Sequence, residues 1–244
     1  MSSEVPVKGE QLYEGKAKII YATSEPETYI QFFKDDASAF NAKKKGSIAD
    51  KGVMNNSVST VIFEYLMSNG IKTHFVKKIS DREQVVKKVD IIPVEVVMRN
   101  RVAGSLAKKM GREEGTELKH PILEFYYKDD DLDDPMINTD YITAFELGNV
   151  DEIEVMSVEA KKINKLLIGF FNSMEIEVID FKLEFGRLSS GDVVLADEIS
   201  PDTCRLWDKK TGEKLDKDRF RFDLGKVEES YQEVLKRVTS KGGS

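Results

Sequence analysis

The stretch Val178-Ile179-Asp180-Phe181-Lys182-Leu183-Glu184-Phe185-Gly186 decides the fold. Apolar and charged side chains alternate along it, which predicts a strand with one face on a core. Asp180, Lys182 and Glu184 then share the opposite face. A solvated sheet surface could carry the same three charges, so this strand alone leaves a functional and a structural interpretation open.

The next predicted strand, Val193–Ile199, favours the functional interpretation. Ser190-Gly191 forms a plausible two-residue hairpin turn, which pairs residues whose numbers add up to 381. Glu184 then faces Asp197 across the hairpin, with Cβ atoms roughly 4.5–5.5 Å apart. Two such carboxylates repel unless a cation lies between them. One or two carboxylates, with phosphate oxygens completing the coordination shell, are typical ligands of nucleotide-bound Mg²⁺. A longer loop with a bulge would shift this register by one residue.

Further strands and helices surround this hairpin. The spacing of apolar residues and the positions of glycine and proline predict β-rich stretches at 12–14, 18–21, 28–33, 73–79 and 85–98. They predict helices at 54–66, 105–110, 151–174 and 227–238. Residues 128–135, rich in aspartate, are expected to form an exposed loop. The order of elements predicts an α+β fold, with a small N-terminal antiparallel sheet lobe (1–92) packed on a larger mixed α+β lobe (93–244).

Composition excludes several classes of function. The 244 residues carry a net charge of −7, which argues against a nucleic-acid partner. No apolar run is long enough to span a membrane, and the segment before residue 10 lacks the apolar core of a secretory signal. The lone Cys204 fits a reducing compartment, so we expect a cytoplasmic protein. His74, in a predicted strand, reads as structural, and His120, before Pro121 in a predicted loop, as a surface residue.

Two segments could bind phosphates. Gly15 sits at a hairpin bend with Lys16 and Lys18 on one strand face, although exposed lysines on an edge strand are commoner. This is not a Walker A loop. Ser105 lies at an expected helix N-cap with Arg99 nearby, which suits an anion; a capping serine beside a solvated arginine is the plainer alternative.

These motifs together resemble the SAICAR synthetase family. Val178–Gly186 and the segment Ile91–Arg99 with Ala103-Gly104-Ser105 look like its two signatures, and the likeness extends from Leu12 to Asp202. The resemblance implies an α+β fold with an ATP cleft between lobes, similar to ATP-grasp proteins. It implies a ligase that joins L-aspartate to carboxyaminoimidazole ribotide (CAIR), giving SAICAR, ADP and phosphate through an acyl phosphate.

The resemblance also implies roles for individual residues. They are Lys16, Lys18, Lys128 and Asp134 at ATP; Ser38, Arg99, Ser105, Asp180, Asp202 and Arg205 at the other substrates; and Lys182, Glu184 and Asp197 as the catalytic set, with Glu184 and Asp197 also holding Mg²⁺. Asn41 departs from the family pattern, because many relatives have an aspartate at this position.

Two other functions remain open at this stage. A small-molecule kinase would use the same Mg²⁺-ATP cleft without aspartate, and a nucleotide-binding regulatory protein would lack the two metal carboxylates. The expected partners are small molecules, and the family resemblance permits a homodimer.

Overall fold

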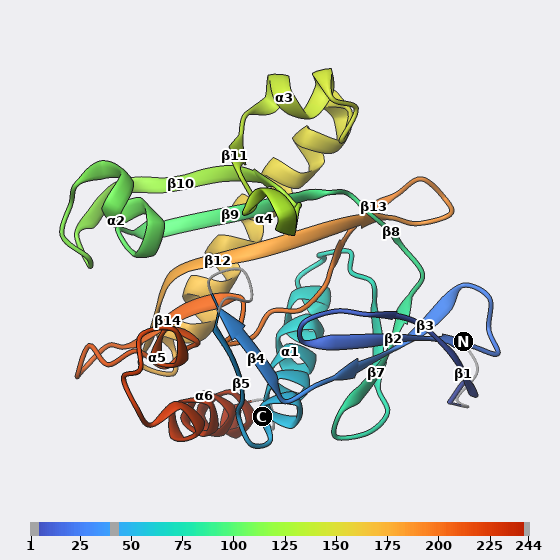
Figure 1. Cartoon of the computed structure of the whole chain (residues 1–244), viewed down its shortest axis with the longest axis horizontal. Coiled ribbons are helices and arrows are strands. Elements are labelled where there is room, and N and C mark those ends of the chain that lie inside the picture. Colours follow the sequence, from blue (N-terminus) through green and yellow to red (C-terminus); the bar gives the residue numbers. More distant parts are fainter. Residues whose placement is uncertain (1–4, 40–43, 242–244) are drawn as a thin grey trace.

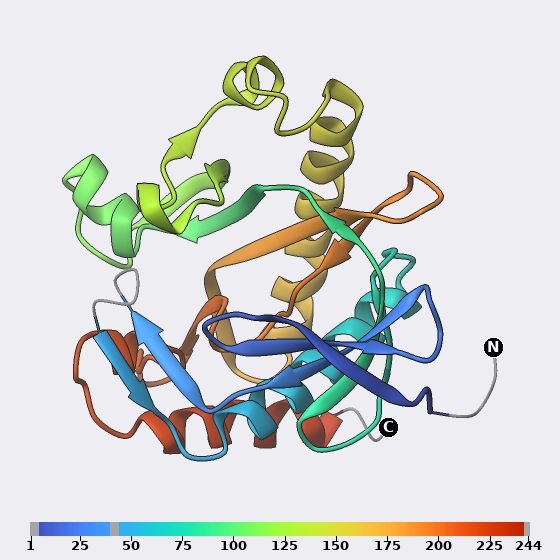
Figure 2. The ribbon, with the colours of Figure 1, turned by 45° about the vertical axis from the view of Figure 1, so that its right-hand side comes forward.

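Two antiparallel sheets form the framework of the protein. The computed structural model describes residues 5–39 and 44–241, so Phe40 and Asn41 lie outside the described residues. The two sheets lie side by side, α4 crosses behind the second sheet, and α1 and α6 pack together (Figures 1 and 2). The predicted α+β fold class is confirmed.

The first sheet has five strands in the order β1-β2-β3-β7-β6. Their bounds are Lys8–Glu14 (β1), Lys18–Thr23 (β2), Thr28–Phe33 (β3), Phe75–Lys78 (β6) and Glu83–Lys87 (β7). The hairpin predicted around Gly15 is present, closed by a hydrogen bond from the Gly15 N–H to the Lys18 carbonyl at 2.8 Å. Lys16 lies within this turn, so the predicted strand face shared with Lys18 is wrong.

A small ribbon and a long helix follow the third strand. The ribbon pairs β4 (Asp36–Ala39) with β5 (Lys44–Ser47), and α1 covers Lys51–Ser68. The helix begins three residues earlier than its apolar periodicity predicts, because its first side chain, Lys51, is buried through an ion pair rather than through hydrophobic contact. Gly70, at φ 79°, ends the helix as expected.

The second sheet is built around β12, the strand quoted at the outset. The main order is β11-β10-β9-β12-β13, and β8 and β14 also pair with β12. The bounds are Asp90–Ile91 (β8), Val94–Arg101 (β9), Glu117–Tyr127 (β10), Met136–Ile137 (β11), Ile176–Arg187 (β12), Val193–Ala196 (β13) and Cys204–Asp208 (β14). β12 is a central strand, and nine of its twelve residues are buried, including Asp180 and Glu184 on its charged face.

The β-rich stretch expected at 85–98 contains parts of three strands, because the chain leaves the first sheet after Lys87 and enters the second at Asp90. One prediction in this region is wrong. His120 and Pro121 lie inside β10 and not in a loop; the pairing of β10 with β9 shifts register between Glu117 and Ile122, and such an irregularity accommodates a proline.

The remaining helices lie on the second sheet, beside the β4–β5 ribbon or against α1. They are α2 (Gly104–Met110), the 3₁₀ turn η1 (Asp130–Leu132), α3 (Thr139–Ala144), α4 (Val150–Asn172), α5 (Asp218–Arg221) and α6 (Val227–Lys241). A capping box of Asn149 and Glu152 starts α4. Its predicted apolar face packs on β12 and β9, with Met156, Ala160 and Ile163 fully buried.

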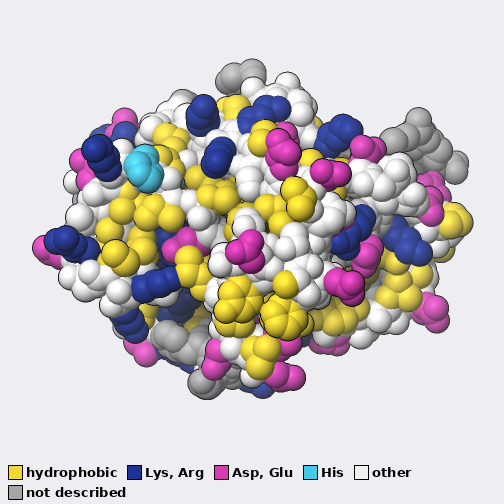
Figure 3. All heavy atoms as spheres, turned by 90° about the horizontal axis from the view of Figure 1, so that it is seen from above, with side chains coloured by type: hydrophobic (Ala, Val, Ile, Leu, Met, Phe, Trp, Pro, Cys, Tyr) yellow, Lys and Arg dark blue, Asp and Glu magenta, His cyan; other side chains and the backbone are white. Residues whose placement is uncertain are grey.

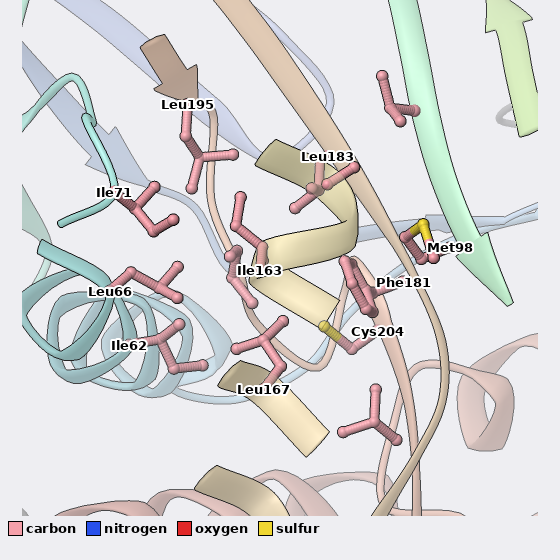
Figure 4. Packing of buried hydrophobic residues seen from close by; sticks show 14 of the residues in the cluster. Ile62, Leu66, Ile71, Met98, Ile163, Leu167, Phe181, Leu183, Leu195 and Cys204 are labelled. Carbon is pink, nitrogen blue, oxygen red and sulfur yellow. The ribbon is translucent and has the colours of Figure 1, made fainter. Parts of the chain in front are cut away.

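One hydrophobic core joins the helices to both sheets. Figure 4 shows Ile62 and Leu66 of α1 close to Ile163 and Leu167 of α4, with Phe181 of β12 to their right. Burial of each such side chain contributes about 1.5–3 kcal/mol. Because α1 lies before residue 92 and α4 after it, this core fixes the first sheet against the second. The predicted boundary after residue 92 falls between β8 and β9.

Gly186, the last residue of the quoted stretch, permits a close crossing. It pairs with Ile91, and a Cβ built there would lie 2.8 Å from the Val89 Cβ. A larger residue at position 186 would push β12 away from the segment around Val89, which connects the two sheets.

The surface is mixed in charge. On the face in Figure 3, acidic and basic side chains are interspersed with small hydrophobic patches. Among the described residues, no helix is long and apolar enough to cross a bilayer.

Candidate active site

A cavity of about 820 Å³ lies between the two sheets. Strands of the first sheet supply one wall, and β9, β12 and the segment after β13 supply the other. Most of the predicted site residues line it: Lys16, Lys18, Ser38, Lys128, Asp134, Lys182, Glu184, Asp197 and Asp202. Arg99, Ser105, Asp180 and Arg205 do not line it.

The two predicted metal carboxylates both reach the cavity, but the predicted register is wrong. Glu184 pairs with Ala196 and not with Asp197. The reason is the loop: the Leu188 N–H donates to the Asp192 carbonyl at 2.9 Å, so the connection is longer than the two residues Ser190-Gly191. The pairing is therefore shifted by one residue.

Asp197 reaches the same cavity by a local distortion. In a regular strand it would point away from the side of Glu184, because a shift of one residue reverses the face. Asp197 has φ 60°, in the left-handed region, which breaks the alternation after β13. Its carboxylate accepts a short hydrogen bond from Lys18 and lies 3.9 Å from the Lys182 Nζ.

Three lysines surround the two acids. Lys182 donates to Glu184 at 2.5 Å and to Glu95 at 2.8 Å, and Lys128 makes a short bond to the other Glu184 oxygen. Burial opposes the charge on Glu184, but Lys182 and Lys128 hold its pKa below the usual range despite Asp197. Burial likewise opposes the charge on Asp197, and Lys18 and Lys182 keep its pKa low. Both carboxylates are therefore ionised at neutral pH.

This donor set fits Mg²⁺ only together with another ligand. In the described part of the chain, no three His, Cys, Asp or Glu side chains lie close enough to hold a metal on their own. Glu184 and Asp197 offer charged oxygens, the ligand type that Mg²⁺ prefers, and phosphate and water oxygens would have to complete the shell. The residues fit a metal that arrives with a nucleotide.

The Gly15 turn faces the acidic loop predicted at 128–135. Lys16 donates to Asp130 at 2.5 Å, and the Asp134 carboxylate accepts from the Asp129 N–H at 3.0 Å. The turn and the loop thus meet across the cavity mouth, with Lys16 beside Lys128 and Asp134 in its lining.

The cavity also has an apolar lining, which contains polar groups without a hydrogen-bond partner. Ile20, Val86 and Ile91 line it together with His74 and Gln31. His74 is 3% exposed, and neither ring nitrogen has a partner. Burial lowers its pKa to about 3, so the ring is neutral. His74 lies just before β6 rather than within a strand; its ring packs edge-on against Phe63, so it serves the core as predicted but also faces the cavity.

A second cluster joins the four predicted residues outside the lining. Asp180 pairs with Arg99 on one neighbouring strand and Arg205 on the other, and it accepts from them at 2.9 and 3.0 Å. Arg99 also donates to Glu124 at 2.6 Å and to the Ser105 hydroxyl at 3.0 Å. Burial opposes the charge on Arg99, but Asp180 and Glu124 raise its pKa.

Ser105 is not the N-cap that the sequence predicts. The cap position is Ala103 and α2 begins at Gly104, so the Ser105 side chain is free to contact Arg99. Gly104 has φ 52°, and a Cβ there would lie 2.5 Å from an Arg205 Nη atom. The glycine lets the Arg205 guanidinium pack against the backbone.

Several residues in or beside the cavity have no signal in the sequence. Asp202 accepts hydrogen bonds from Lys51 at 2.7 Å and from the Tyr231 hydroxyl at 2.6 Å, although both donors are far from Asp202 in the chain. Lys217 and Arg221 also line the cavity. They belong to a run of charged residues, and such runs usually form solvated surface.

Comparison with known proteins identifies the family. The SAICAR synthetase family model matches residues 11–238. The phosphoribosylaminoimidazole-succinocarboxamide synthase of Magnetococcus marinus is 60% identical over 233 residues, 95% of this chain and 96% of the relative. The chain belongs to the SAICAR synthetase family. The predicted family, and with it the predicted ligase class, is confirmed.

Solved SAICAR synthetases share this fold over nearly their whole length. The crystal structure from Ehrlichia chaffeensis has a TM-score of 0.93 and 49% identity, over 94% of this chain and 98% of that one. A SAICAR synthetase solved in complex with ADP has a TM-score of 0.91 and 46% identity, over 95% of this chain and 98% of that one.

Proposed function

We propose that the protein joins L-aspartate to the carboxylate of CAIR, with ATP as the energy source, to give SAICAR, ADP and phosphate. The observation that carries this proposal is the pair of ionised carboxylates, Glu184 and Asp197, set among three lysines in a cavity shared by both sheets. A related enzyme of the same fold binds ADP. As an enzyme of purine biosynthesis, it would act in the cytoplasm.

The cavity would take ATP with its base on apolar side chains and its phosphates among lysines. Ile20 and Val86 offer contact area for the base. Lys16, Lys18 and Lys128 supply positive charge for the phosphates. Burial opposes the charge on Lys18, yet Asp197 and Glu198 keep its pKa high, so it stays charged.

Glu184 and Asp197 would hold Mg²⁺ together with the nucleotide phosphates. An ion held there would supply positive charge to neutralise the phosphates. Lys128 pairs with Glu184 in the structure and its side chain is 42% exposed, so it can turn from the carboxylate toward a phosphate. Lys182, anchored by Glu95 and Glu184, stays on the cavity floor next to the transferred group.

The ribotide would bind across the second cluster. Arg99, Ser105 and Arg205 would hold its phosphate; Arg99 contacts Ser105, and Arg205 packs on the neighbouring Gly104. Asp180, Asp202 and Ser38 would border the imidazole ring and its carboxylate. The two clusters meet along β12, because Asp180, Lys182 and Glu184 alternate on one face of this strand.

The chemistry requires an activated carboxylate. A CAIR carboxylate oxygen attacks the γ-phosphorus, the bond to the bridging oxygen breaks, and ADP leaves with that electron pair. The aspartate amine then attacks the acyl carbon, the carbon–oxygen bond to phosphate breaks, and phosphate and a proton are released. Charge neutralisation and alignment are the main demands of phosphoryl transfer, and Lys16, Lys18 and Lys182 supply both.

The proposal is tested by ADP release from purified protein with Mg²⁺-ATP and CAIR, with and without L-aspartate. We expect ADP release to depend on aspartate and to match amide formation mole for mole. Equal ADP release without aspartate would instead identify a kinase that phosphorylates CAIR or a related small molecule.

A further inference from the structure

Two residues of β10, Glu124 and Tyr126, have no role in the assignments above, yet both contact Arg99. They are two positions apart, so their side chains share one face of the strand. Arg99 pairs with Ile122 on this face, which places Glu124 diagonally across from it, within reach of a long side chain. Arg99 and Glu124 are both 4% exposed, so their charges meet away from water.

The three side chains form a closed triangle of hydrogen bonds. The Arg99 Nε donates to Oε2 of Glu124 at 2.6 Å, and the Arg99 Nη2 donates to the Tyr126 hydroxyl at 3.1 Å. The Tyr126 hydroxyl in turn donates to the same Glu124 oxygen at 2.9 Å. Burial raises the pKa of Tyr126, although Arg99 opposes this shift, so the hydroxyl keeps its proton at neutral pH. Because the guanidinium group is held at two of its nitrogen atoms, the triangle fixes its plane.

The triangle also decides which donors of Arg99 remain for a ligand. A guanidinium group has five N–H donors, and the triangle uses two of them. Nη2 also donates to the Ser105 hydroxyl at 3.0 Å, and Nη1 donates to Asp180 at 2.9 Å. Among the described residues, these four bonds leave one N–H, on Nη1, without an acceptor. The Ser105 hydroxyl accepts from Arg99, so its own proton can be donated to a ligand.

We propose that Glu124 and Tyr126 are positioning residues, which orient Arg99 so that its remaining N–H can bind the ribotide phosphate. This inference rests on the proposed function, in which Arg99 and Ser105 hold that phosphate. Without the triangle, Arg99 could turn toward Asp180 and form a forked pair, the geometry that arginine and carboxylate groups prefer. Such a pair would use the donor that the phosphate needs. Neither Glu124 nor Tyr126 lines the cavity, so both act through Arg99.

Steady-state kinetics of Tyr126→Phe tests this role, because phenylalanine keeps the aromatic side chain and removes only the hydroxyl. The substrates compared are CAIR and its nucleoside, which lacks the phosphate. Loss of one hydrogen bond of the triangle should lower the preference in kcat/KM for CAIR over the nucleoside by about 3- to 10-fold. The KM values for ATP and aspartate should change by less than about twofold, because Arg99 is not assigned to either substrate.

Tyr127→Phe is the matched control. Tyr127 is the next residue of β10, points to the opposite face of the strand and loses the same hydroxyl group. This variant should keep the full preference for CAIR over the nucleoside. Glu124→Gln is a second variant, which keeps the size of the side chain but removes the charge that holds Arg99. It should lower the preference by about 10- to 100-fold, and Tyr126→Phe still decides the question if Glu124→Gln folds poorly.

Two results for Tyr126→Phe would overturn the positioning role while the proposed function stands. One is an unchanged preference for CAIR over the nucleoside. The other is an equal rise in the KM values for CAIR, ATP and aspartate, which is the result expected of a merely structural contact. A wild-type protein without this preference would contradict the assignment of Arg99 to the phosphate, and this inference with it. A wild-type protein that releases no aspartate-dependent ADP would instead overturn the proposed function itself.

Discussion

Replacing Lys51 by Met should destabilise the protein through Asp202. The Lys51 ammonium group is 2.7 Å from the Asp202 carboxylate, and the two side chains are 1% and 5% exposed. Methionine keeps the apolar length of lysine but leaves a buried carboxylate without its main partner. Burial opposes the charge on Asp202, and Lys217 and Lys51 together hold its pKa far below the usual range.

The expected loss follows from the geometry. Removing one partner of a buried ion pair costs about 3–5 kcal/mol. Lys217, at 3.8 Å, still faces Asp202, so we expect the lower end, about 3 kcal/mol. For a chain of this size, such a loss lowers the unfolding midpoint by roughly 6–12 °C.

Urea unfolding at pH 7, followed by far-UV circular dichroism and by the fluorescence of Trp207, measures this loss. Lys72→Met is the control: its pair with Asp192 spans 3.2 Å, but the side chains are 71% and 52% exposed, so its loss should cost less than about 1 kcal/mol. If both variants lose the same small amount, the buried pair does not stabilise the fold and the reasoning is refuted.

Three further predictions concern the cavity and the cluster beside it. Glu184→Gln should lower kcat by about 10²–10³-fold while the thermal midpoint stays within a few degrees; near-normal turnover at saturating Mg²⁺-ATP would remove Glu184 from the catalytic set. Arg99→Ala should raise the KM for CAIR much more than that for ATP, and should also lower stability by about 3–5 kcal/mol, because Asp180 and Glu124 lose their partner; equal effects on both KM values would place Arg99 outside the ribotide site. His74→Gln should flatten the pH dependence of the free energy of unfolding, because the native pKa of about 3 lies below the ordinary 6.5. The stability from the neutral ring is complete above pH 6.5 and is lost as the pH falls toward 3, at up to about 1.4 kcal/mol per pH unit. Urea unfolding curves with equal pH slopes for both proteins would contradict this.

The parts of the fold that follow local rules could be predicted from the sequence. The alternation of β12 and the apolar stripe of α4 depend only on periodicities of two and 3.6 residues, and both elements are present as expected. The hairpin at Gly15 follows from its turn residue in the same way. A strand that contains a proline, such as β10 with Pro121, breaks these rules and was therefore missed.

The pairing of Glu184 could not be fixed in this way. Ser190-Gly191 satisfies the rules for a two-residue turn, and only the hydrogen bond across the longer loop from Leu188 to Asp192 decides against it. The acids still converge, because the left-handed conformation of Asp197 offsets the shift of one residue. Aspartate adopts that conformation more readily than most residues, but the sequence around Asp197 does not single it out among the other aspartates.

Contacts distant in sequence were equally out of reach. Asp202 depends on Lys51, 151 positions away, and on the hydroxyl of Tyr231. Arg99 and Arg205 meet at Asp180 because β12 lies between β9 and β14, and this strand order is a property of the whole sheet.

The most direct test of the account is a crystal structure with Mg²⁺ and a non-hydrolysable ATP analogue. We expect one Mg²⁺ bound by carboxylate oxygens of Glu184 and Asp197 and by phosphate oxygens, with Lys128 moved from Glu184 to a phosphate. A nucleotide bound elsewhere, or an ion that touches neither acid, would contradict the account.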